Sequence, residues 1–435
     1  MKHMTSAVHA PTPPLTLADT GLEMVLCRDI LLKTVFRRNL SVASEIADAL
    51  CVLPPVAMEL IEICRENGLL ETLGMRGSST SAELRYQLTD GGKSRALDAL
   101  EQSEYFGALP ITLEDFRAQS ARQSITDVAI TKERLEGSMS HLVLPDGMLD
   151  QLGPAVNSGK SVLLYGPPGN GKSSISNGIR DALGDKIFVP RFIEYAGQVI
   201  SVFDPIVHSE AEAEGQEANS LRRAIQHDPR YVLCRRPTVM TGGELTLDML
   251  DLNFNQTSRT YQAPLQLKAT GGVFIVDDLG RQQEPPQALI NRWIVPMEGG
   301  YDILSLQSGQ KFMVPFDTLV IFSTNFAPAE LFDGAALRRI YYKILIDGPS
   351  RDDFIKVFLK VSQHYKIKPS EQVITHLLTN KYPAVDNNFA SYHAPFLIDQ
   401  MLSICEYEQR EREMSVELVD RAWENLFVKE RTIAK

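Results

Sequence analysis

One short segment of the sequence carries the residue types and spacing that bind phosphate groups. It follows the pattern G-x-x-x-x-G-K-[ST], and its residues are Gly166, Pro167, Pro168, Gly169, Asn170, Gly171, Lys172 and Ser173. Glycines let backbone N–H groups point inward around phosphate oxygens. The Lys172 ammonium can reach the β- and γ-phosphate oxygens, and the Ser173 hydroxyl can ligate Mg²⁺. We assign these residues and the adjacent Ser174 to the binding of a nucleotide.

The residues on both sides of the loop predict the setting that such a loop needs. The apolar run from Ser161 to Tyr165 predicts a strand, and residues 173–183 predict a helix. The N-terminus of a helix adds a favourable dipole for an anion. An ordinary glycine-rich turn is the alternative, but such a turn requires neither neighbour. The sequence therefore predicts a site for ATP with Mg²⁺.

Two acidic residues follow a second predicted strand. Asp277 and Asp278 come directly after the apolar run from Gly272 to Val276. Ligands bind at the carboxyl ends of the strands in open α/β sheets. We expect Asp277 to hold Mg²⁺ through water and Asp278 to polarise the water that attacks the γ-phosphate. The alternative is a pair of acids that only ends a strand.

Two further sets of polar residues lie later in the chain. Asn325 follows the apolar strand from Leu319 to Ser323, so we expect its amide to orient water against the γ-phosphate. Arg338 and Arg339 lie beside apolar residues, and their pattern alone favours the solvated end of a helix. A guanidinium inserted at the γ-phosphate would instead stabilise the charge that develops there.

The order of these features, followed by a helical tail, resembles the AAA+ family of ATPases across about residues 140 to 430. The resemblance implies a ring of subunits, usually a hexamer, in which arginines of one subunit complete the nucleotide site of its neighbour. It assigns roles by motif position, with Walker A at Lys172 and Ser173, Walker B at Asp277 and Asp278, sensor 1 at Asn325, and arginine fingers at Arg338 and Arg339.

The sequence departs from that family at two positions. Asp278 stands where most such ATPases carry Glu, and its side chain is one methylene shorter. Because a misplacement of about 1 Å can lower a rate about a hundredfold, slow hydrolysis is one hypothesis. The second departure is the absence of an arginine from residues 391–397, where the family often has its sensor 2 residue. Coupling between nucleotide and lid would then be weaker or use another residue.

The coarse pattern divides the chain into five segments. Residues 1–15 predict a disordered tail, 16–110 a winged-helix-like α+β domain, 111–140 a polar linker with some helix, 141–346 an α/β ATPase core, and 347–435 a helical lid. Apolar strands that alternate with helical stretches predict that the core contains a parallel sheet. The predicted fold class is therefore α/β, with a lid and an N-terminal domain added to the core.

The N-terminal domain resembles the winged-helix family over about residues 20 to 105, because three predicted helices precede a two-strand wing. Such a domain can bind DNA, but its charges argue against that role. Residues 15–110 contain 14 acidic and nine basic side chains, and the third helix carries Arg65 against Glu59, Glu62 and Glu66. We therefore expect a protein interaction or a packing role.

Two predicted hairpins and one insertion complete the core. Residues 302–315 predict a hairpin before sensor 1, which is similar to the MoxR-like branch of the AAA+ family, although a plain surface hairpin is the alternative. Tyr195 and Gly197 resemble the aromatic-hydrophobic-glycine pore loop with which AAA+ unfoldases grip polypeptide. We favour the simpler interpretation, in which Gly197 makes the turn of a hairpin. The insertion at 235–269 carries no motif that we can assign.

Composition limits the classes of partner and compartment. The 44% hydrophobic and 23% charged residues are typical of globular domains, and a net charge of -11 disfavours nonspecific binding to nucleic acid. The five cysteines are widely spaced without a C-x-x-C pair, which predicts reduced thiols. Without a signal peptide or an apolar run of about 18 residues, we expect a cytoplasmic protein.

These predictions lead to one main functional hypothesis and two alternatives. The main hypothesis is an ATP-driven homo-oligomeric ring that remodels a protein partner of unknown identity. The first alternative is a winged-helix DNA-binding regulator that ATP switches, and the second is a nucleotide sensor that hydrolyses ATP slowly. Fold analogy does not supply the partner or substrate.

Overall fold

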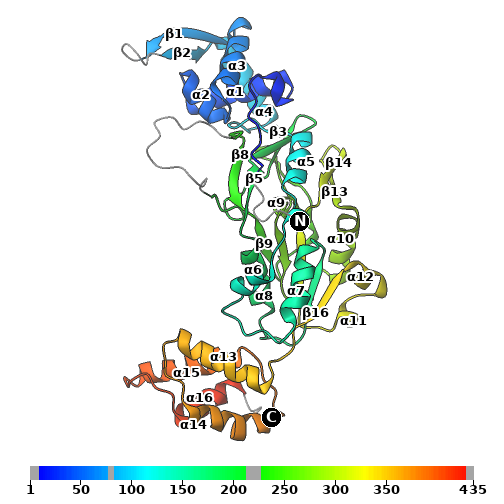
Figure 1. Ribbon diagram of the computed structural model, residues 1–435. Helices are drawn as coiled ribbons and strands as arrows, with labels where there is room; N and C mark the ends of the chain where they lie inside the picture. The colour runs from blue at the N-terminus through cyan, green and yellow to red at the C-terminus, as the bar shows by residue number, and fades with distance from the viewer. Residues whose placement is uncertain (1–8, 77–82, 212–226, 428–435) are drawn as a thin grey trace, which may run out of the picture. The chain divides into compact units, whose positions relative to one another are not determined.

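The computed structural model describes residues 9–76, 83–211 and 227–427 (Figure 1). The contacts within the chain divide it into two compact units. Unit 1 comprises residues 1–129, 184–274 and 288–319, and unit 2 comprises residues 130–183, 275–287 and 320–435. Each unit is therefore assembled from segments that are far apart in the sequence.

The N-terminal part of unit 1 is a helical bundle with a hairpin. Its elements are η1 Ala18–Thr20, α1 Met24–Arg38, α2 Ala43–Leu50, α3 Pro54–Glu66, β1 Leu70–Arg76, β2 Glu83–Leu88 and α4 Asp90–Gln102. Pro54 lies in the first turn of α3, where its missing N–H has no helical partner in any case. Thr89 caps α4 by accepting a hydrogen bond from the Gly92 N–H. The predicted order of helices and antiparallel strands is present, and the resemblance to the winged-helix family stays a prediction.

The rest of unit 1 is mostly β structure. A five-stranded sheet has the order β10-β11-β7-β6-β3, and β5 pairs with β8 in a separate two-stranded sheet. The bounds are β3 Ile111–Thr112, β5 Lys186–Pro190, β6 Phe192–Tyr195, β7 Gln198–Ser201, β8 Tyr231–Arg235, β9 Thr238–Thr241, β10 Asn253–Asn255, β11 Thr260–Gln262, α5 Leu113–Arg122, η2 Ile125–Asp127, η3 Leu247–Leu250 and α9 Leu265–Lys268. Segment 111–140, expected to be a linker, contributes β3, α5 and η2 here.

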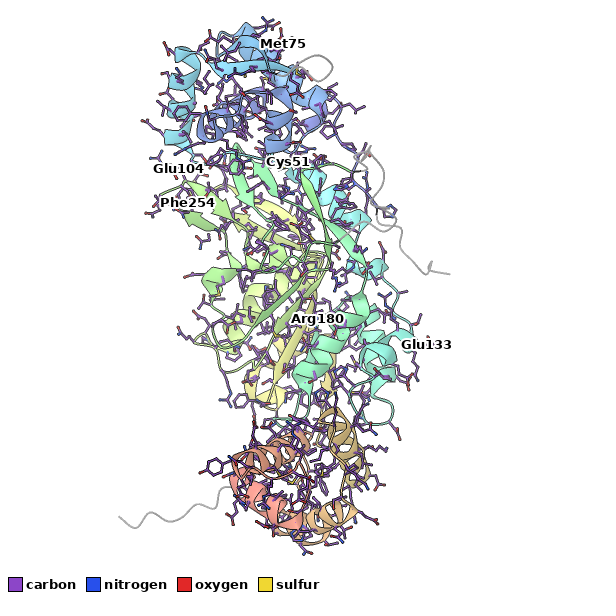
Figure 2. The ribbon with its side chains drawn as sticks, turned by 90° about the vertical axis from the view of Figure 1, so that its left-hand side faces the viewer. Cys51, Met75, Glu104, Glu133, Arg180 and Phe254 are labelled. Atoms are coloured by element: carbon purple, nitrogen blue, oxygen red, sulfur yellow. The ribbon has the colours of Figure 1, made fainter. Side chains whose placement is uncertain are left out.

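The insertion at 235–269 extends the larger sheet of unit 1. Its strands β10 and β11 form an antiparallel pair, and β11 continues the sheet by pairing in parallel with β7. The turn between them reaches the helical bundle, because the Glu104 N–H donates to the Ser258 carbonyl oxygen at 2.9 Å. Figure 2 labels Glu104, which follows α4, and Phe254 on β10. A segment without a sequence motif thus has a structural role.

Both hairpins predicted in the core are present in unit 1. The turn between β6 and β7 has left-handed backbone at Ala196 (φ 50°) and Gly197 (φ 76°), which suits a tight hairpin. The second hairpin consists of β13 Tyr301–Ser305 and β14 Lys311–Pro315, and it follows α10 Pro286–Gly299. The Tyr195 ring stacks on Phe312 of β14 at 4.3 Å between ring centroids. The pore-loop role of Tyr195 and Gly197 stays a prediction.

Unit 2 contains the strands that hold the predicted nucleotide loop. Its elements outside the lid are α6 Lys132–Ser138, α7 Met148–Asn157, β4 Val162–Tyr165, α8 Lys172–Leu183, β15 Leu319–Thr324, α11 Pro328–Leu331, α12 Gly334–Arg339 and β16 Tyr342–Leu345, and β12 Val273–Val276 leads into its acidic segment. The strands β16, β4, β15 and β12 are neighbours in that order. Strand β4 is parallel to both neighbours, with Val162 opposite Ile321 and Tyr342. The predicted α/β class with a parallel sheet is confirmed.

The C-terminal part of unit 2 is helical, and we call it the lid, although its role as a lid stays a prediction. Its elements are α13 Arg351–His364, α14 Glu371–His376, the π-helix η4 Leu377–Lys381, the 3₁₀ helix η5 Tyr382–Val385, α15 His393–Tyr407 and α16 Val416–Leu426. Ser350 and Ser415 cap α13 and α16 through their hydroxyls. Aromatic rings fill the lid core, where Tyr382 packs edge-on against Phe354 and Trp423.

The described residues also bear on the predictions about membrane spans and cysteines. Within them, no helix combines the length and the apolar character needed to cross a membrane. All five cysteines are thiols without a disulfide bond, as expected. Burial raises the pKa of Cys27 to about 12, so this thiol stays protonated and unreactive at neutral pH.

Candidate functional site

The predicted phosphate-binding loop connects β4 to α8, as its sequence requires. Three of its glycines have left-handed backbone, with φ 135° at Gly166, 77° at Gly169 and 87° at Gly171. Gly166 also approaches the backbone closely, because a Cβ there would lie 2.4 Å from the Ile346 carbonyl oxygen. The loop can therefore adopt its shape only with glycine at these positions.

Lys172, the first residue of α8, directs its ammonium into the loop. Its Nζ donates hydrogen bonds to the Gly166 carbonyl oxygen at 2.8 Å, the Pro167 carbonyl oxygen at 2.9 Å and Asn325 Oδ1 at 2.7 Å. Burial lowers the pKa of Lys172, and the carboxylates of Asp277 and Asp278 oppose that shift. The three acceptors match the three N–H donors of an ammonium group.

Ser173 and Asp277 supply the oxygen atoms expected at a magnesium site. The Ser173 hydroxyl donates to Asp277 Oδ2 at 2.8 Å, which places a hydroxyl oxygen and a carboxylate oxygen side by side. Mg²⁺ usually takes one or two protein oxygens and completes its shell with water and phosphate. Across the described residues, no group of three His, Cys, Asp or Glu side chains could hold a metal ion. The pair fits Mg²⁺ bound together with a nucleotide.

Asp278 has an unusual backbone conformation at the end of β12. Its φ is 53°, in the left-handed region that Asp and Asn tolerate better than longer side chains. Its Oδ1 accepts a hydrogen bond from Asn325 Nδ2 at 2.8 Å, and Arg281 Nε lies 3.6 Å from Oδ2. The next residue, Leu279, donates its N–H to the Ser323 carbonyl oxygen at 2.7 Å, which fixes this turn against β15. Sequence spacing gave no sign of this constraint.

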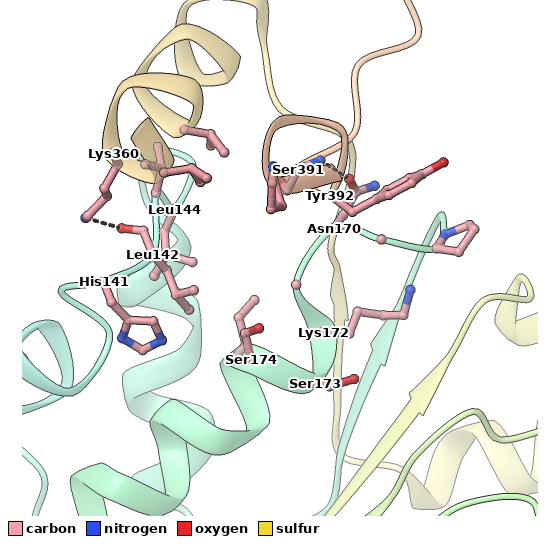
Figure 3. A pocket seen from close by; sticks show the side chains of 18 of the residues that line it. His141, Leu142, Leu144, Asn170, Lys172, Ser173, Ser174, Lys360, Ser391 and Tyr392 are labelled. Carbon is pink, nitrogen blue, oxygen red and sulfur yellow. Dashed lines mark hydrogen bonds between the residues drawn. The ribbon is translucent and has the colours of Figure 1, made fainter. Parts of the chain in front are cut away.

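A cavity of about 1140 Å³ in unit 2 adjoins these residues. It is lined by His141, Leu142, Val143, Leu144, the loop residues Pro168 to Ile175, Asp277, Asp278, Ser323, Asn325, and the lid residues Val357, Lys360, Val361, Gln363, His364, Tyr365, Ser391, Tyr392 and Pro395. Figure 3 shows the strap of residues 141–144, the loop and the lid around this space. A volume in this range is sufficient for a nucleotide-sized ligand.

Sequence reasoning missed the strap and the lid residues of this cavity. Lys360 Nζ donates to the Leu142 carbonyl oxygen at 3.0 Å and also to that of Ser140, so α13 is joined to the strap (Figure 3). Lys360 and Leu142 are far apart in the chain, and neither belongs to a recognisable motif. No local pattern could have found them.

The structure does not bring every predicted site residue to the cavity. Lys172, Ser173, Asp277, Asp278 and Asn325 lie together, but the two arginines on α12 are not among the lining residues. Asp333 caps this short helix by accepting the Ala336 N–H at 2.7 Å. Arg338 is exposed and Arg339 is half-buried, with a guanidinium that donates to the Ala335 carbonyl oxygen at 2.9 Å.

A family with the description "Domain of unknown function (DUF8689)" matches residues 350–425, within the lid and well under half of the chain. No curated protein matches the sequence.

Two solved structures show a weak similarity. The Holliday junction branch migration motor RuvB of Thermotoga maritima is 13% identical, with a TM-score of 0.34 and coverage of 71% of this chain and 73% of that one. NtrX from Brucella abortus is 12% identical, with a TM-score of 0.38 and coverage of 75% and 66%. At this level, neither protein's activity transfers to the chain.

Replacing Gly166 by alanine should destabilise the protein more than replacing Gly171. Both positions have left-handed backbone, and such strain costs about 1–3 kcal/mol. Only Gly166→Ala adds a contact of 2.4 Å with the Ile346 carbonyl oxygen, since Gly171 has no atom within 4 Å of an added Cβ. Chemical denaturation measures both free energies of unfolding. Equal losses would contradict the importance of this close approach.

Proposed function

We propose that the chain is an ATPase of the AAA+ type, which binds ATP with Mg²⁺ in the cavity of unit 2 and hydrolyses the bond to the γ-phosphate. One observation carries this proposal. Five side chains meet beyond the ends of three strands, where hydrogen bonds join Lys172 to Asn325, Asn325 to Asp278, and Ser173 to Asp277. A phosphate-binding loop beside an acid pair and an amide supplies the groups that phosphoryl transfer to water requires.

Each residue has its own part in the proposed reaction. The loop N–H groups and the Lys172 ammonium bind the phosphate oxygens. Ser173 and Asp277 would hold Mg²⁺, which neutralises charge on the β- and γ-phosphate oxygens when it is bound. Asp278 polarises the attacking water, and Asn325 orients both that water and the Asp278 carboxylate through its amide.

Replacing Lys172 by alanine tests nucleotide binding. We expect the wild type to bind ADP and to release phosphate from ATP, and Lys172→Ala to weaken binding about a hundredfold, because a charged hydrogen bond to phosphate is lost. Lys132→Ala is a matched control, since Lys132 pairs with Asp150 on the exposed surface outside the cavity. Calorimetric titration gives the affinity. A wild type without ADP binding, or a fully active Lys172→Ala, would refute the proposal.

We propose further that Arg338 and Arg339 complete the nucleotide site of a neighbouring copy in a ring. Two features support this arrangement. Neither arginine lines the cavity of its own chain. Beside them, Tyr341 is 63% exposed, so α12 and the start of β16 present a surface with arginine and aromatic side chains. Both kinds of residue are enriched at protein interfaces.

A mixing experiment tests whether the arginines act between subunits. The double variant Arg338→Ala/Arg339→Ala and the single variant Lys172→Ala should each be nearly inactive. When the two variants are mixed, activity should return in part. The Lys172→Ala subunit still has its arginines, and these can complete the intact nucleotide site of the double variant. Phosphate release measures activity, and light scattering with and without nucleotide measures assembly. Mixed assemblies that form without any recovery would show that the arginines do not act in trans.

A protein partner is the proposed target of the ring. Support comes from the outer face of the hairpin β13 and β14, where Ile303 and Met313 are paired and 45% and 51% exposed. Apolar side chains on an exposed hairpin favour contact with polypeptide rather than with a charged nucleic acid backbone. Helix α3 is consistent with this, because Glu62 pairs with its one arginine, Arg65.

A slowly hydrolysing nucleotide sensor is the second candidate function. The left-handed backbone of Asp278 favours it, because this conformation suits Asp better than Glu. The backbone at the end of β12 thus favours aspartate, whose carboxylate reaches less far toward an attacking water than that of glutamate.

Asp278→Glu tests whether the short acid limits the rate. We expect hydrolysis to rise at least about tenfold as the carboxylate reaches further, and the melting temperature to fall because Glu is strained at φ 53°. Asp278→Asn is the control, since it tolerates the same backbone but lacks a carboxylate, and it should abolish hydrolysis without a loss of stability. An unchanged rate in Asp278→Glu would remove this explanation for slow turnover.

A further inference from the structure

Two hydrogen bonds, both donated by backbone N–H groups of the lid, join the lid to the phosphate-binding loop. The Ser391 N–H donates to Asn170 Oδ1 at 3.1 Å, and the Tyr392 N–H donates to the Gly169 carbonyl oxygen at 3.0 Å. Figure 3 shows the first bond, with the Tyr392 side chain beside the loop. Both donors precede α15, so this helix is tied directly to the residues before Lys172.

Side-chain packing reinforces these bonds. The Tyr392 ring lies against Gly169, where an added Cβ would be 2.1 Å from Tyr392 Cδ1. Asn170 is only 8% exposed. Glycine at 169 is therefore needed for the approach of the lid as well as for the shape of the loop.

The contacting residues are also anchored in the lid core. His393, which follows Tyr392, is buried, and its Nδ1 bonds to the Tyr382 hydroxyl at 3.0 Å. Burial lowers the pKa of His393 to about 4, so the ring is neutral and its Nδ1 can accept this hydrogen bond at physiological pH. Movement of Gly169 and Asn170 would thus be passed to the aromatic core of the lid.

The lid offers few cations for a direct contact with phosphate. The basic lid residues that line the cavity are Lys360 and His364. The Lys360 ammonium is directed to the carbonyl oxygens of Leu142 in the strap and of Ser140 just before it. The start of α15, where an arginine is absent from the sequence, contacts the loop through its backbone and Tyr392 instead.

We propose that Asn170 and Gly169 couple the lid to the loop, so that the lid responds to occupation of the α- and β-phosphate positions, which ADP and ATP share. This inference rests on the proposed function. The loop N–H groups cradle the α- and β-phosphates, and residues 169 and 170 belong to that loop while also holding Ser391 and Tyr392. A cation directed at the γ-phosphate would distinguish ATP from ADP. The contact of Ser391 and Tyr392 with the loop would respond equally to both nucleotides.

The first experiment measures the coupling without nucleotide. Hydrogen–deuterium exchange at residue resolution should show Ser391 exchanging about tenfold faster in Asn170→Ala than in the wild type, because its acceptor is lost. Asn170→Asp keeps an acceptor oxygen and should retain the protection. The Met401 amide, in the middle of α15, should be unchanged in both variants, which shows that the lid stays folded. Unchanged Ser391 exchange in Asn170→Ala would overturn the inference.

The second experiment compares ADP with a slowly hydrolysed ATP analogue, each saturating and with Mg²⁺. In the wild type both should slow exchange at Ser391 and Tyr392 to the same extent, within about twofold. If only the ATP analogue slowed exchange at Ser391 and Tyr392, the inference would be overturned, because the lid would then respond to the γ-phosphate. If calorimetry detects binding of neither nucleotide, the proposed function fails, and with it the role of the contact in nucleotide sensing. The first experiment still reports separately on the contact itself.

Discussion

The chain of hydrogen bonds from Lys172 through Asn325 to Asp278 is the interaction on which the site depends. It crosses from the loop after β4 to the ends of β15 and β12, with bonds of 2.7 and 2.8 Å. An amide suits the middle position because its oxygen accepts from the ammonium while its nitrogen donates to the carboxylate. A carboxylate at position 325 would repel Asp278, and an apolar side chain would leave both neighbours without this partner. One side chain therefore sets the positions of a cation and an anion together.

The parallel sheet makes that chain possible. Strands β4 and β15 run in the same direction, so their carboxyl ends and the residues that follow them meet at one edge. All residues of β12 and β15 are buried, which explains why β12 and the first four residues of β15 are apolar without alternation. Asp277 and Asn325 each follow directly after the last residue of their strand. Burial of the apolar strands therefore fixes the positions of the polar residues that follow them. The left-handed backbone at position 278 favours aspartate over glutamate.

The loop has two structural tasks at once. Its glycines give the backbone the left-handed conformations that a phosphate cradle needs, while Gly169 and Asn170 also receive the lid. Contact through backbone N–H groups differs from contact through an arginine, because it depends on the shape of the loop and not on a particular phosphate. A lid attached in this way suits a protein whose response follows occupancy. The match of residues 350–425 to a domain of unknown function lies in this same lid.

Local pattern was sufficient to predict the elements of the candidate site. The loop, the acid pair and Asn325 are each found from a few neighbouring residues, and so are the two hairpins, because strand, turn and helix signals act over short distances. Other features required the folded chain. The left-handed backbone of Asp278, the strap held by Lys360, the extension of a sheet by the insertion, and the contact of Ser391 and Tyr392 with the loop all join segments distant in sequence. Their energies come from packing and hydrogen bonds between those segments, which no local pattern encodes.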